Sequence, residues 1–298
     1  MTTPRVNVIL PFLNEGRSFS KALTAILAQE ERGFVLNAIY VISDGSTDDT
    51  VAQATALNNP KIRVVDHKDK KGQLVRLNEG FQLDDADYII QTDGDCEFGN
   101  IHVISSIVTE FKDSKVMMVA GNAQPREPKN FIERGICSTY MAYSGAASEL
   151  DCGNNIWMVH GCVLAFRREF VKGFEVPAEV VVQDWFMYLR CMKEGSIFKF
   201  AKDALVYFSV PSTISDHIKQ VKRYLSTSNL LNRFFDSEFI KLRTKQNIKL
   251  MLKHQMLQFI KAPVETIFVF IINRLVEIQI KLYKVKPSAN WERVFAKV

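Results

Sequence analysis

Ala38–Leu57 reads AIYVISDGSTDDTVAQATAL, and this stretch indicates the fold class. It begins with an almost continuous apolar run, which is typical of a strand buried on both faces of a sheet. Ser46 and Asp49 then form an S-x-x-D pattern, which predicts a capping box at the start of a helix that runs to about Leu57. A buried strand, a short turn and a capped helix together predict an α/β fold.

The same alternation continues on both sides of this stretch. Strands are predicted over 6–12, 62–65 and 88–92, and helices over 19–28 and 72–82. Repeated strand–helix units with short connections predict a mostly parallel central sheet with helices on both faces. Because such sheets bind ligands outside the carboxyl ends of their strands, polar clusters at those ends are the candidate site.

The later part of the chain is predicted to be mainly helical. Helices are predicted near 131–149 and 184–194, and the chain after Pro211 is predicted to be almost wholly helical. One helix carries an apolar stripe formed by Val264, Ile267, Phe268, Ile271, Leu275, Ile278 and Leu282. Glu265 and Arg274 interrupt this run, so we do not expect it to cross a bilayer.

The composition is that of a globular protein. Hydrophobic residues make up 47% of the chain and charged residues 24%, which excludes an intrinsically disordered chain. The N-terminus lacks the apolar core and cleavage site of a secretory signal. The five cysteines are scattered without a C-x-x-C spacing, which favours reduced thiols in a cytoplasmic protein over a disulfide framework or a zinc site.

Positive charge is concentrated towards the C-terminus. Residues 226–298 contain 13 Lys/Arg and 5 Asp/Glu, a net charge of +8, whereas the whole chain carries +5 and the remainder therefore −3. This pattern is compatible with peripheral docking on the anionic cytoplasmic face of a membrane, or with a solvated helical face. Burial of the stripe against the rest of the chain or in a homodimer interface is the alternative. Nucleic-acid binding is not expected, because the tail aromatics lie among aliphatic residues rather than between cations.

Asp93-Gly94-Asp95 directly follows the predicted strand 88–92. We expect Gly94 to let the backbone turn so that the carboxylates face one point. Two carboxylates at a strand end suit a hard divalent cation whose shell is completed by substrate phosphates. Such a cation neutralises a pyrophosphate leaving group, although D-G-D is also common in plain turns.

Three further acidic or basic positions are candidates with structural alternatives. Asp44 is either a turn residue or an acceptor of hydrogen bonds from a base or ribose. Lys71 lies before a predicted helix, either near phosphates or in an exposed loop. Asp184 is either a general base in an apolar setting or a helix cap.

Gln220, Arg223 and Tyr224 share one face of a predicted helix by their i, i+3, i+4 spacing. An amide, a guanidinium and an aromatic ring on one face suit a diphosphate and a stacked sugar. An amphipathic surface helix is the alternative.

In their order along the chain, these clusters resemble the family 2 inverting glycosyltransferases with a GT-A fold, which belong to the nucleotide-diphospho-sugar transferase superfamily. The resemblance runs from about residue 6 to residue 224. It is carried by Val8–Glu15 (VILPFLNE), Asp44–Asp48 (DGSTD), Lys71–Gly72 with Leu77–Gly80 (LNEG), Asp93–Asp95 (DGD), Gly161–Cys162 with Ala165–Arg168 (AFRR), Asp184 and Gln220–Tyr224 (QVKRY).

The resemblance implies a role for each matched position. The metal, Mn²⁺ or Mg²⁺, would bind to Asp93 and Asp95, with Asp95 the more direct ligand. The catalytic base would be Asp184, which would deprotonate the acceptor hydroxyl for an inverting attack. The nucleotide and donor would be contacted by Pro11, Asn14, Glu15, Asp44, Lys71, Asp93, Gln220 and Arg223. The acceptor side would include Gly161, Cys162, Trp185 and Tyr224.

Three positions depart from the family pattern. Ser43 stands where the family often has a second Asp before Asp44, so base recognition is expected to differ. Gln183 stands where an acid commonly precedes the catalytic base, which removes one charge. Tyr224 replaces the usual Trp, which argues against a processive polymerase, as does the lack of a predicted spanning segment.

The resemblance thus implies a GT-A catalytic domain over 1–225, with nucleotide-sugar binding in 1–122 and the acceptor side in 123–225. Residues 226–298 are predicted to be a basic amphipathic helical extension. The expected activity is metal-dependent, inverting transfer of single sugars, with a UDP-sugar favoured as donor and a glycan or lipid-linked acceptor. The expected role is cell-surface polysaccharide or glycolipid synthesis. The alternative is a non-catalytic member that binds a nucleotide or sugar.

Overall fold

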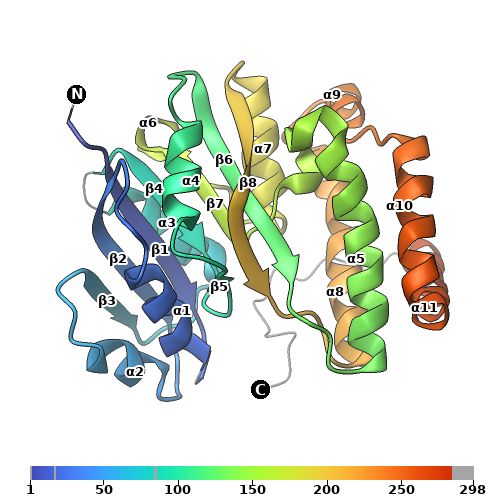
Figure 1. Ribbon diagram of the computed structural model, residues 1–298, viewed down its shortest axis with the longest axis horizontal. Coiled ribbons are helices and arrows are strands. Elements are labelled where there is room, and N and C mark those ends of the chain that lie inside the picture. Colours follow the sequence, from blue (N-terminus) through green and yellow to red (C-terminus); the bar gives the residue numbers. More distant parts are fainter. Residues whose placement is uncertain (1, 17, 84–85, 284–298) are drawn as a thin grey trace. The chain divides into compact units, whose positions relative to one another are not determined.

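A computed structural model describes residues 2–16, 18–83 and 86–283 (Figure 1). Within these residues the chain forms two compact units, each assembled from separate segments. The first unit contains Met1–Gln124, Val159–Ala178 and Arg190–Phe208, and the second contains Pro125–Met158, Glu179–Leu189 and Ser209–Val298. The functional division predicted at residues 122 and 225 stays a prediction.

The first unit is built on a sheet with the strand order β3-β2-β1-β4-β7-β6-β8-β5. The four strands predicted from the sequence pair in parallel and are β1 (Arg5–Phe12), β2 (Val35–Asp44), β3 (Ile62–His67) and β4 (Tyr88–Thr92). The other strands are β5 (Glu97–Phe98), β6 (Val116–Pro125), β7 (Val163–Arg167) and β8 (Ile197–Phe208). Antiparallel pairs join β7 to β4 and β6, and β5 to β8, so these strands extend the parallel half.

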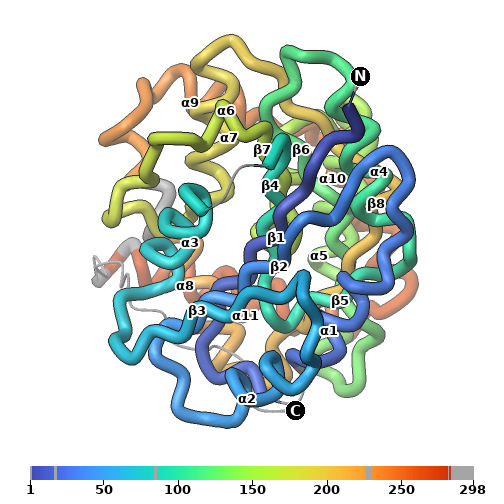
Figure 2. Tube along the Cα trace, turned by 90° about the vertical axis from the view of Figure 1, so that its left-hand side faces the viewer, coloured from blue at the N-terminus to red at the C-terminus, as the bar shows by residue number. Residues whose placement is uncertain are grey.

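Helices cover both faces of this sheet. They are α1 (Ser18–Leu27), α2 (Thr50–Ala56), α3 (Gln73–Gln82), α4 (Val103–Glu110) and α6 (Arg168–Val171). Val8 and Leu10 of β1 lie in one buried cluster with Leu23 of α1 and with residues of α4. Ile9 points to the other face of the sheet, towards α3, because successive side chains of a strand alternate between faces. Its Cγ2 atom lies 2.5 Å from the position that a Cβ on Gly80 of α3 would take. Figure 2 shows α3 and α4 on opposite sides of β1, which confirms the predicted α/β fold.

The predicted capping box at Ser46 is wrong. Helix α2 begins at Thr50 with Asp49 as its N-cap residue, and the Asp49 side chain makes no capping hydrogen bond. The Ser46 hydroxyl instead accepts a hydrogen bond from the backbone N–H of Asn14, at 3.1 Å. Asp48 accepts hydrogen bonds from both the N–H and the hydroxyl of Thr50. The polar turn therefore connects the ends of β1 and β2 before the helix starts.

The second unit is helical and centres on α5 (Phe131–Glu149). Its other long helices are α8 (Ile214–Leu231), α9 (Ser237–Arg243), α10 (Ile248–Lys261) and α11 (Pro263–Tyr283), and it contains the start of α7 (Gln183–Lys193). Both α10 and α11 pack on α5, because α5 presents small residues to them. A Cβ on Gly135 would lie 2.5 Å from the backbone oxygen of Glu265, and one on Gly145 would lie 2.3 Å from the His254 ring.

The apolar stripe of α11 is exposed within the described part of the chain. Its members Val264, Ile267, Ile271, Leu275, Ile278 and Leu282 are 49–72% exposed. Val269 and Val276 of the same helix are buried instead. The seventh stripe residue, Phe268, is partly buried and packs edge-on against Phe131 of α5, with ring centroids 5.4 Å apart, so burial against the rest of the chain is observed for this residue and not for the other six. None of the described helices combines the length and hydropathy needed to cross a membrane.

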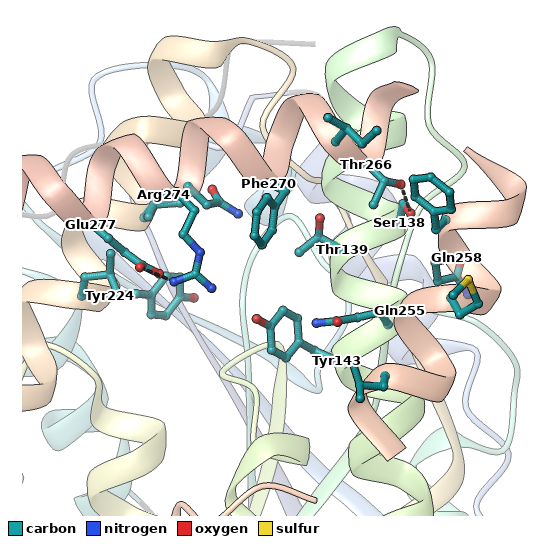
Figure 3. Close-up of a pocket in the computed structure, with 18 residues that line it drawn as sticks. Ser138, Thr139, Tyr143, Tyr224, Gln255, Gln258, Thr266, Phe270, Arg274 and Glu277 are labelled. Atoms are coloured by element: carbon teal, nitrogen blue, oxygen red, sulfur yellow. Dashed lines mark hydrogen bonds and ion pairs between the residues drawn. The ribbon is translucent and has the colours of Figure 1, made fainter. Parts of the chain in front are cut away.

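Helices α5, α8, α10 and α11 line a pocket of about 570 Å³, which we name the helical pocket (Figure 3). Its apolar walls include Ala142, Val221, Leu225, Leu252, Met256 and Phe270. All of its lining residues belong to the second unit.

Candidate active site

In the first unit, the loops that follow β1, β2 and β4 meet at the carboxyl edge of the parallel strands. Asn14 adopts a positive φ of 55°, and its side-chain oxygen accepts hydrogen bonds from the backbone N–H groups of Thr47 and Asp48. Asn and Asp tolerate this backbone region better than most residues, which explains an Asn at the turn. The Pro11–Glu15 loop and the Asp44–Asp48 turn are therefore one hydrogen-bonded structure, as their position after neighbouring strands predicted.

Asp44 is fully buried and holds the loop before α3. Its carboxylate accepts hydrogen bonds from the N–H groups of Lys71 and Gly72, each at 2.8 Å, and from Arg76 Nε at 2.9 Å. Arg76 is also buried and makes a second ion pair with Asp69. A direct contact between Asp44 and a nucleotide stays a prediction, because the observed role of this carboxylate is to position the Lys71–Gly72 loop.

Lys71 lies on that loop, and its ammonium group is 3.1 Å from Asp69 Oδ2. Hydrogen bonds from Lys71 and Arg76 lower the pKa of Asp69 to about 2, so this carboxylate is ionised at neutral pH. The Lys71 side chain remains 59% exposed at the end of β2 and β3. It is therefore available to an anionic ligand at this edge.

The Asp93–Asp95 turn belongs to the same edge. Asp93 Oδ1 accepts a hydrogen bond from Gln73 Nε2 at 2.8 Å, which ties the turn to the first residue of α3. The predicted reason for Gly94 needs correction: its φ lies outside the left-handed region, so backbone freedom is not what it supplies. A Cβ there would lie 2.9 Å from Glu15 Cγ and 3.1 Å from the Phe19 ring, so Gly94 provides space for the β1 loop.

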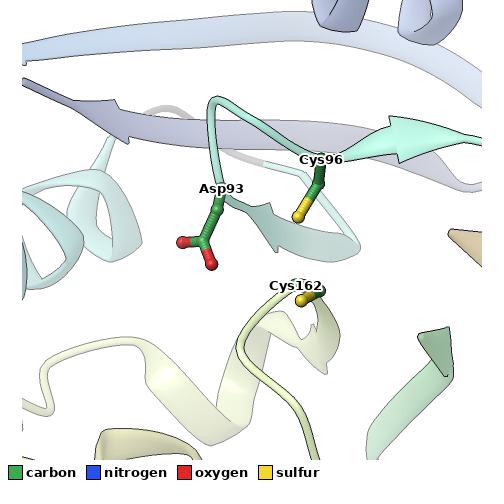
Figure 4. A group of neighbouring side chains, drawn as sticks. All are labelled: Asp93, Cys96 and Cys162. Atoms are coloured by element: carbon green, nitrogen blue, oxygen red, sulfur yellow. The ribbon is translucent and has the colours of Figure 1, made fainter. Parts of the chain in front are cut away.

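Two cysteines lie beside Asp93. Donor atoms of Asp93, Cys96 and Cys162 lie within 4.8 Å of one another, around one space in Figure 4. Two contacts hold Cys162 at this position. Val163 of β7 pairs with Thr92 of β4, and the Thr92 hydroxyl donates a hydrogen bond to the Cys162 carbonyl at 2.6 Å. The predicted acceptor-side residue Cys162 therefore lies next to the predicted metal ligand Asp93, together with Gly161 on the same loop.

The donor set at this edge fits a hard cation better than a soft one. Mn²⁺ and Mg²⁺ prefer oxygen ligands, which the partly exposed Asp93 and Asp95 supply. A hydrogen bond with Cys162, together with burial, raises the pKa of the Cys96 thiol well above its usual value. The preference for a hard cation therefore rests on the carboxylate oxygens of Asp93 and Asp95.

Three residues of this site were not predicted from the sequence. Gln73 and Arg76 occupy the first turn of α3, and Cys96 follows Asp95 directly. The signal for Arg76 was its spacing of one helical turn from Gly72, which points a side chain back at the loop before the helix. For Cys96 the sequence offered no signal, because its neighbour Cys162 comes from a distant segment.

Asp184 lies in the second unit, in the first turn of α7. It is the second residue of the helix rather than its N-cap, and its Oδ1 atom accepts a hydrogen bond from the N–H of Trp185 at 2.8 Å. The Trp185 ring packs edge-on against Trp157, with centroids 5.1 Å apart. This contact with a first-turn N–H group is compatible with the helix-cap alternative, and the role of Asp184 as catalytic base stays a prediction.

Gln220, Arg223 and Tyr224 lie on α8 of the second unit, as their spacing predicted. The Arg223 guanidinium is 5.7 Å from the centre of the Tyr224 ring. Tyr224 is 49% exposed and lines the helical pocket beside Val221. The structure thus places a predicted acceptor-binding residue at an apolar pocket.

The sequence model of glycosyl transferase family 2 matches residues 7–174. The chain belongs to this family. A second model, glycosyl transferase family group 2, matches residues 100–276. The first match contains the loops after β1, β2 and β4, and the second contains Asp184 and Gln220–Tyr224.

Two curated relatives are glycosyltransferases of bacteria. The O-antigen chain rhamnosyltransferase RfbN of Salmonella typhimurium is 25% identical over 230 residues, which cover 75% of this chain and 71% of the relative. Poly-beta-1,6-N-acetyl-D-glucosamine synthase of Staphylococcus aureus is 22% identical over 241 residues, which cover 78% of this chain and 57% of the synthase. This chain therefore matches little more than half the length of the synthase.

Solved structures confirm the GT-A fold. The mannosyltransferase PcManGT from Pyrobaculum calidifontis, in complex with GDP-Man and Mn²⁺, has a TM-score of 0.60 at 17% identity, over 95% of this chain and 76% of that one. Glucosyl-3-phosphoglycerate synthase from Mycobacterium tuberculosis, in complex with Mn²⁺, UDP and phosphoglyceric acid, has a TM-score of 0.54 at 15% identity, over 77% and 78% of the two chains.

Proposed function

We propose that this glycosyltransferase uses a divalent cation to transfer single sugars, with inversion, from a nucleotide diphosphate donor to a glycan or lipid-linked acceptor. The observation that carries the proposal is the convergence of four loops in the first unit, those after β1, β2, β3 and β4. Asn14, Asp44, Lys71 and Asp93 all lie at the carboxyl edge of the parallel strands, the position at which such sheets bind ligands.

Each group at this edge has a chemical use in the proposed reaction. Asp93 and Asp95 would hold Mn²⁺ or Mg²⁺, and the cation would stabilise the charge that develops on the diphosphate leaving group. Lys71 would add a second positive charge near the phosphates. The two structural neighbours with Mn²⁺ in their complexes support a divalent cation here.

In the second unit, Asp184 would remove the proton from the acceptor hydroxyl as it attacks the anomeric carbon. Trp185, with Tyr224, would contact the acceptor. Tyr224 in place of the family's usual Trp supports transfer of one sugar for each acceptor encounter. The rhamnosyltransferase and synthase relatives support a role in cell-surface polysaccharide or glycolipid synthesis.

We further propose that the enzyme docks on an anionic membrane surface through α10 and α11. The support is the exposed apolar stripe of α11 and the basic character of residues 226–298. Interfacial helices combine these same two features. Docking would place the enzyme at a lipid-linked acceptor.

The first experiment is a thermal-shift panel with UDP, GDP, TDP and CDP, each with and without Mn²⁺. A ligand of the native state stabilises it by RT ln(1 + [L]/Kd), about 2.7 kcal/mol at a hundredfold excess over Kd. We expect UDP to raise the melting temperature only when Mn²⁺ is present. A rise in melting temperature with a different diphosphate would show that the donor sugar is carried by that nucleotide. No rise with any of the four would contradict the proposed donor site.

A further inference from the structure

The helical pocket is apolar although it lies at the surface of the second unit. Leu252 and Met256 of α10 are 61% and 60% exposed, and Phe270 of α11 is 54% exposed. In Figure 3, Phe270, Tyr143 and Thr139 surround the middle of the pocket, where helices α5, α10 and α11 approach one another. Its volume of about 570 Å³ falls within the roughly 300–1,000 Å³ of small-molecule sites.

Several polar groups on the pocket wall already have partners. The hydroxyl groups of Ser138 and Thr266 are hydrogen-bonded at 2.6 Å, and the Thr139 hydroxyl donates to the Gly135 carbonyl. Arg274 is ion-paired with Glu277 at 2.6 Å. A hydrocarbon chain in the pocket leaves these contacts in place.

Polar and apolar features have separate places in the pocket. Arg274, Glu277 and Tyr224 lie towards one end in Figure 3, and Ser138 and Thr266 towards the other. The first end therefore places an Arg274–Glu277 ion pair and a phenol beside an apolar interior. This arrangement is complementary to a molecule with a hydrocarbon chain and a polar head.

Charge around the pocket favours a lipid as the occupant. Exposed Lys249 and Lys261 lie on α10, and the described residues 226–283 contain nine Lys/Arg and four Asp/Glu, a net charge of +5. An anionic lipid supplies both the hydrocarbon chain and the negative charge that this surface complements. A second copy of the chain would instead bring an equally basic surface to the same place.

We propose that the helical pocket binds the hydrocarbon chain of a lipid phosphate, and that this chain belongs to the acceptor. The second clause rests on the proposed transferase function, which gives Tyr224 an acceptor role. The pocket would hold the hydrocarbon chain of the acceptor, and the phosphate head group would lie at the end that contains Tyr224 and Arg274.

The test uses the full chain and two probes that share one head group, dodecyl phosphate and methyl phosphate, titrated calorimetrically below the critical micelle concentration. We expect dodecyl phosphate to bind and methyl phosphate not to bind measurably. Between octyl and dodecyl phosphate, each added methylene should tighten binding by about threefold to fourfold. An affinity independent of chain length would overturn the proposal.

Two substitutions on α10 provide a matched comparison. Leu252→Glu places a charge in the pocket, whereas Leu257→Glu places the same charge at a 46% exposed position that does not line it. We expect the first to weaken dodecyl phosphate binding at least tenfold and the second by less than twofold. An equal loss of affinity for dodecyl phosphate in both variants would show that the probe binds to the apolar surface in general. That result would overturn the proposed binding in the pocket.

Failure of this proposal is distinguishable from failure of the transferase function. Metal-dependent release of nucleoside diphosphate from a donor sugar, with water as the acceptor, reports on the first unit's site without a lipid. If this release occurs but dodecyl phosphate does not bind, the pocket proposal fails alone. If dodecyl phosphate binds but no nucleotide sugar is turned over with any lipid phosphate, the link to the acceptor fails.

Discussion

Asp93 and Asp95 have different surroundings although one residue separates them. Asp93 accepts a hydrogen bond from Gln73 at 2.8 Å, which fixes its carboxylate towards α3. Asp95 is approached by the Cys96 thiol at 3.8 Å, and a thiol is a weak donor. Asp93 thus also joins the turn to α3, and the assignment of Asp95 as the more direct metal ligand stays a prediction.

Asp95→Ala should leave the fold intact and remove metal-dependent turnover. Loss of a metal ligand removes charge stabilisation of the leaving diphosphate, so we expect kcat to fall by at least about 100-fold. The measurement is turnover of a nucleotide sugar over a range of Mn²⁺ concentrations. Glu97→Ala, at an exposed position of β5, is the control and should retain activity. Full activity of Asp95→Ala would remove the metal assignment.

Asp184→Asn tests the proposed base independently of the metal. The amide has nearly the same shape but does not accept a proton, so kcat should fall by about 100-fold or more. The Mn²⁺-dependent thermal shift with the diphosphate should be unchanged, because the metal ligands lie in the other unit. Retained turnover would contradict the role of base, and a lost thermal shift would indicate a structural role.

At the scale of the element, α5 organises the second unit through its small residues. Gly135 lies against the backbone of α11, and Gly145 lies against a side chain of α10. Ser138 adds a hydrogen bond to Thr266 at the same interface. The close approach of the helices fixes one face of α10 and α11 on α5 and leaves the opposite apolar faces exposed.

Gly135→Ala should destabilise the protein, contrary to the usual effect of this change in a helix. Alanine normally stabilises a helix interior by about 0.5–1 kcal/mol relative to glycine. Here the new methyl group meets the Glu265 carbonyl oxygen, and such overpacking costs about 1–3 kcal/mol. Urea denaturation measures the change, with Ser148→Ala on the same helix as a surface control. A stabilised variant would show that α11 does not approach α5 this closely.

His217 joins α8 to α11 and makes the second unit sensitive to acid. Its Nε2 donates to Asn273 Oδ1 at 2.8 Å, and burial lowers its pKa, although the bond to Asn273 acts in the opposite direction. A proton added at Nδ1 would occupy a buried position at which the described structure shows no acceptor. Protonation therefore favours the unfolded chain.

The sign of the pH dependence follows from the lowered pKa. The stabilising contribution of neutral His217 is complete above the unfolded pKa of about 6.5 and is lost as the pH falls below it. We expect this residue to contribute a slope of at most about 1.4 kcal/mol per pH unit in that range. His217→Gln should reduce the slope measured by urea denaturation at a series of pH values. An unchanged slope would assign the acid sensitivity to other groups.

At the scale of the whole molecule, positive charge and exposed apolar side chains are concentrated in the same part of the chain. The basic residues 226–298 include the two helices with the most exposed large hydrophobic side chains, α10 and α11. The residues before them carry a net negative charge. This asymmetry supports attraction of one part of the protein to an anionic surface.

The full-length protein should co-sediment with phosphatidylglycerol vesicles at low salt and be released at about 0.5 M salt, because screening weakens the attraction. Ile278→Glu, at a 52% exposed stripe position, should reduce binding several-fold. Ile101→Glu, at a 49% exposed position of the first unit, is the matched control and should bind like the unaltered chain. Equal binding of both variants would contradict docking through α11.

Much of the fold followed from the sequence because its signals are local. The predicted strand 88–92 coincides with β4, and the predicted helix 131–149 coincides with α5. Apolar runs and helical spacing report the burial of each segment directly. The predicted capping box is wrong because the Ser46 hydroxyl accepts a hydrogen bond from the backbone N–H of Asn14. Asn14 lies in the loop after β1, and no local sequence pattern reveals this partner.

For the site, the sequence by itself determined which loops carry acidic and basic groups and that they follow parallel strands, because strand ends can be located from periodicity. The tertiary structure alone decided which of these groups touch. Asp44 supports the Lys71 loop, Gly94 makes room for Glu15, and Cys162 lies beside Asp93. These contacts join segments that are distant in the chain, and packing, rather than residue order, determines such neighbours. For the same reason, only packing on α5 decided which apolar residues of α10 and α11 are buried and which line the helical pocket.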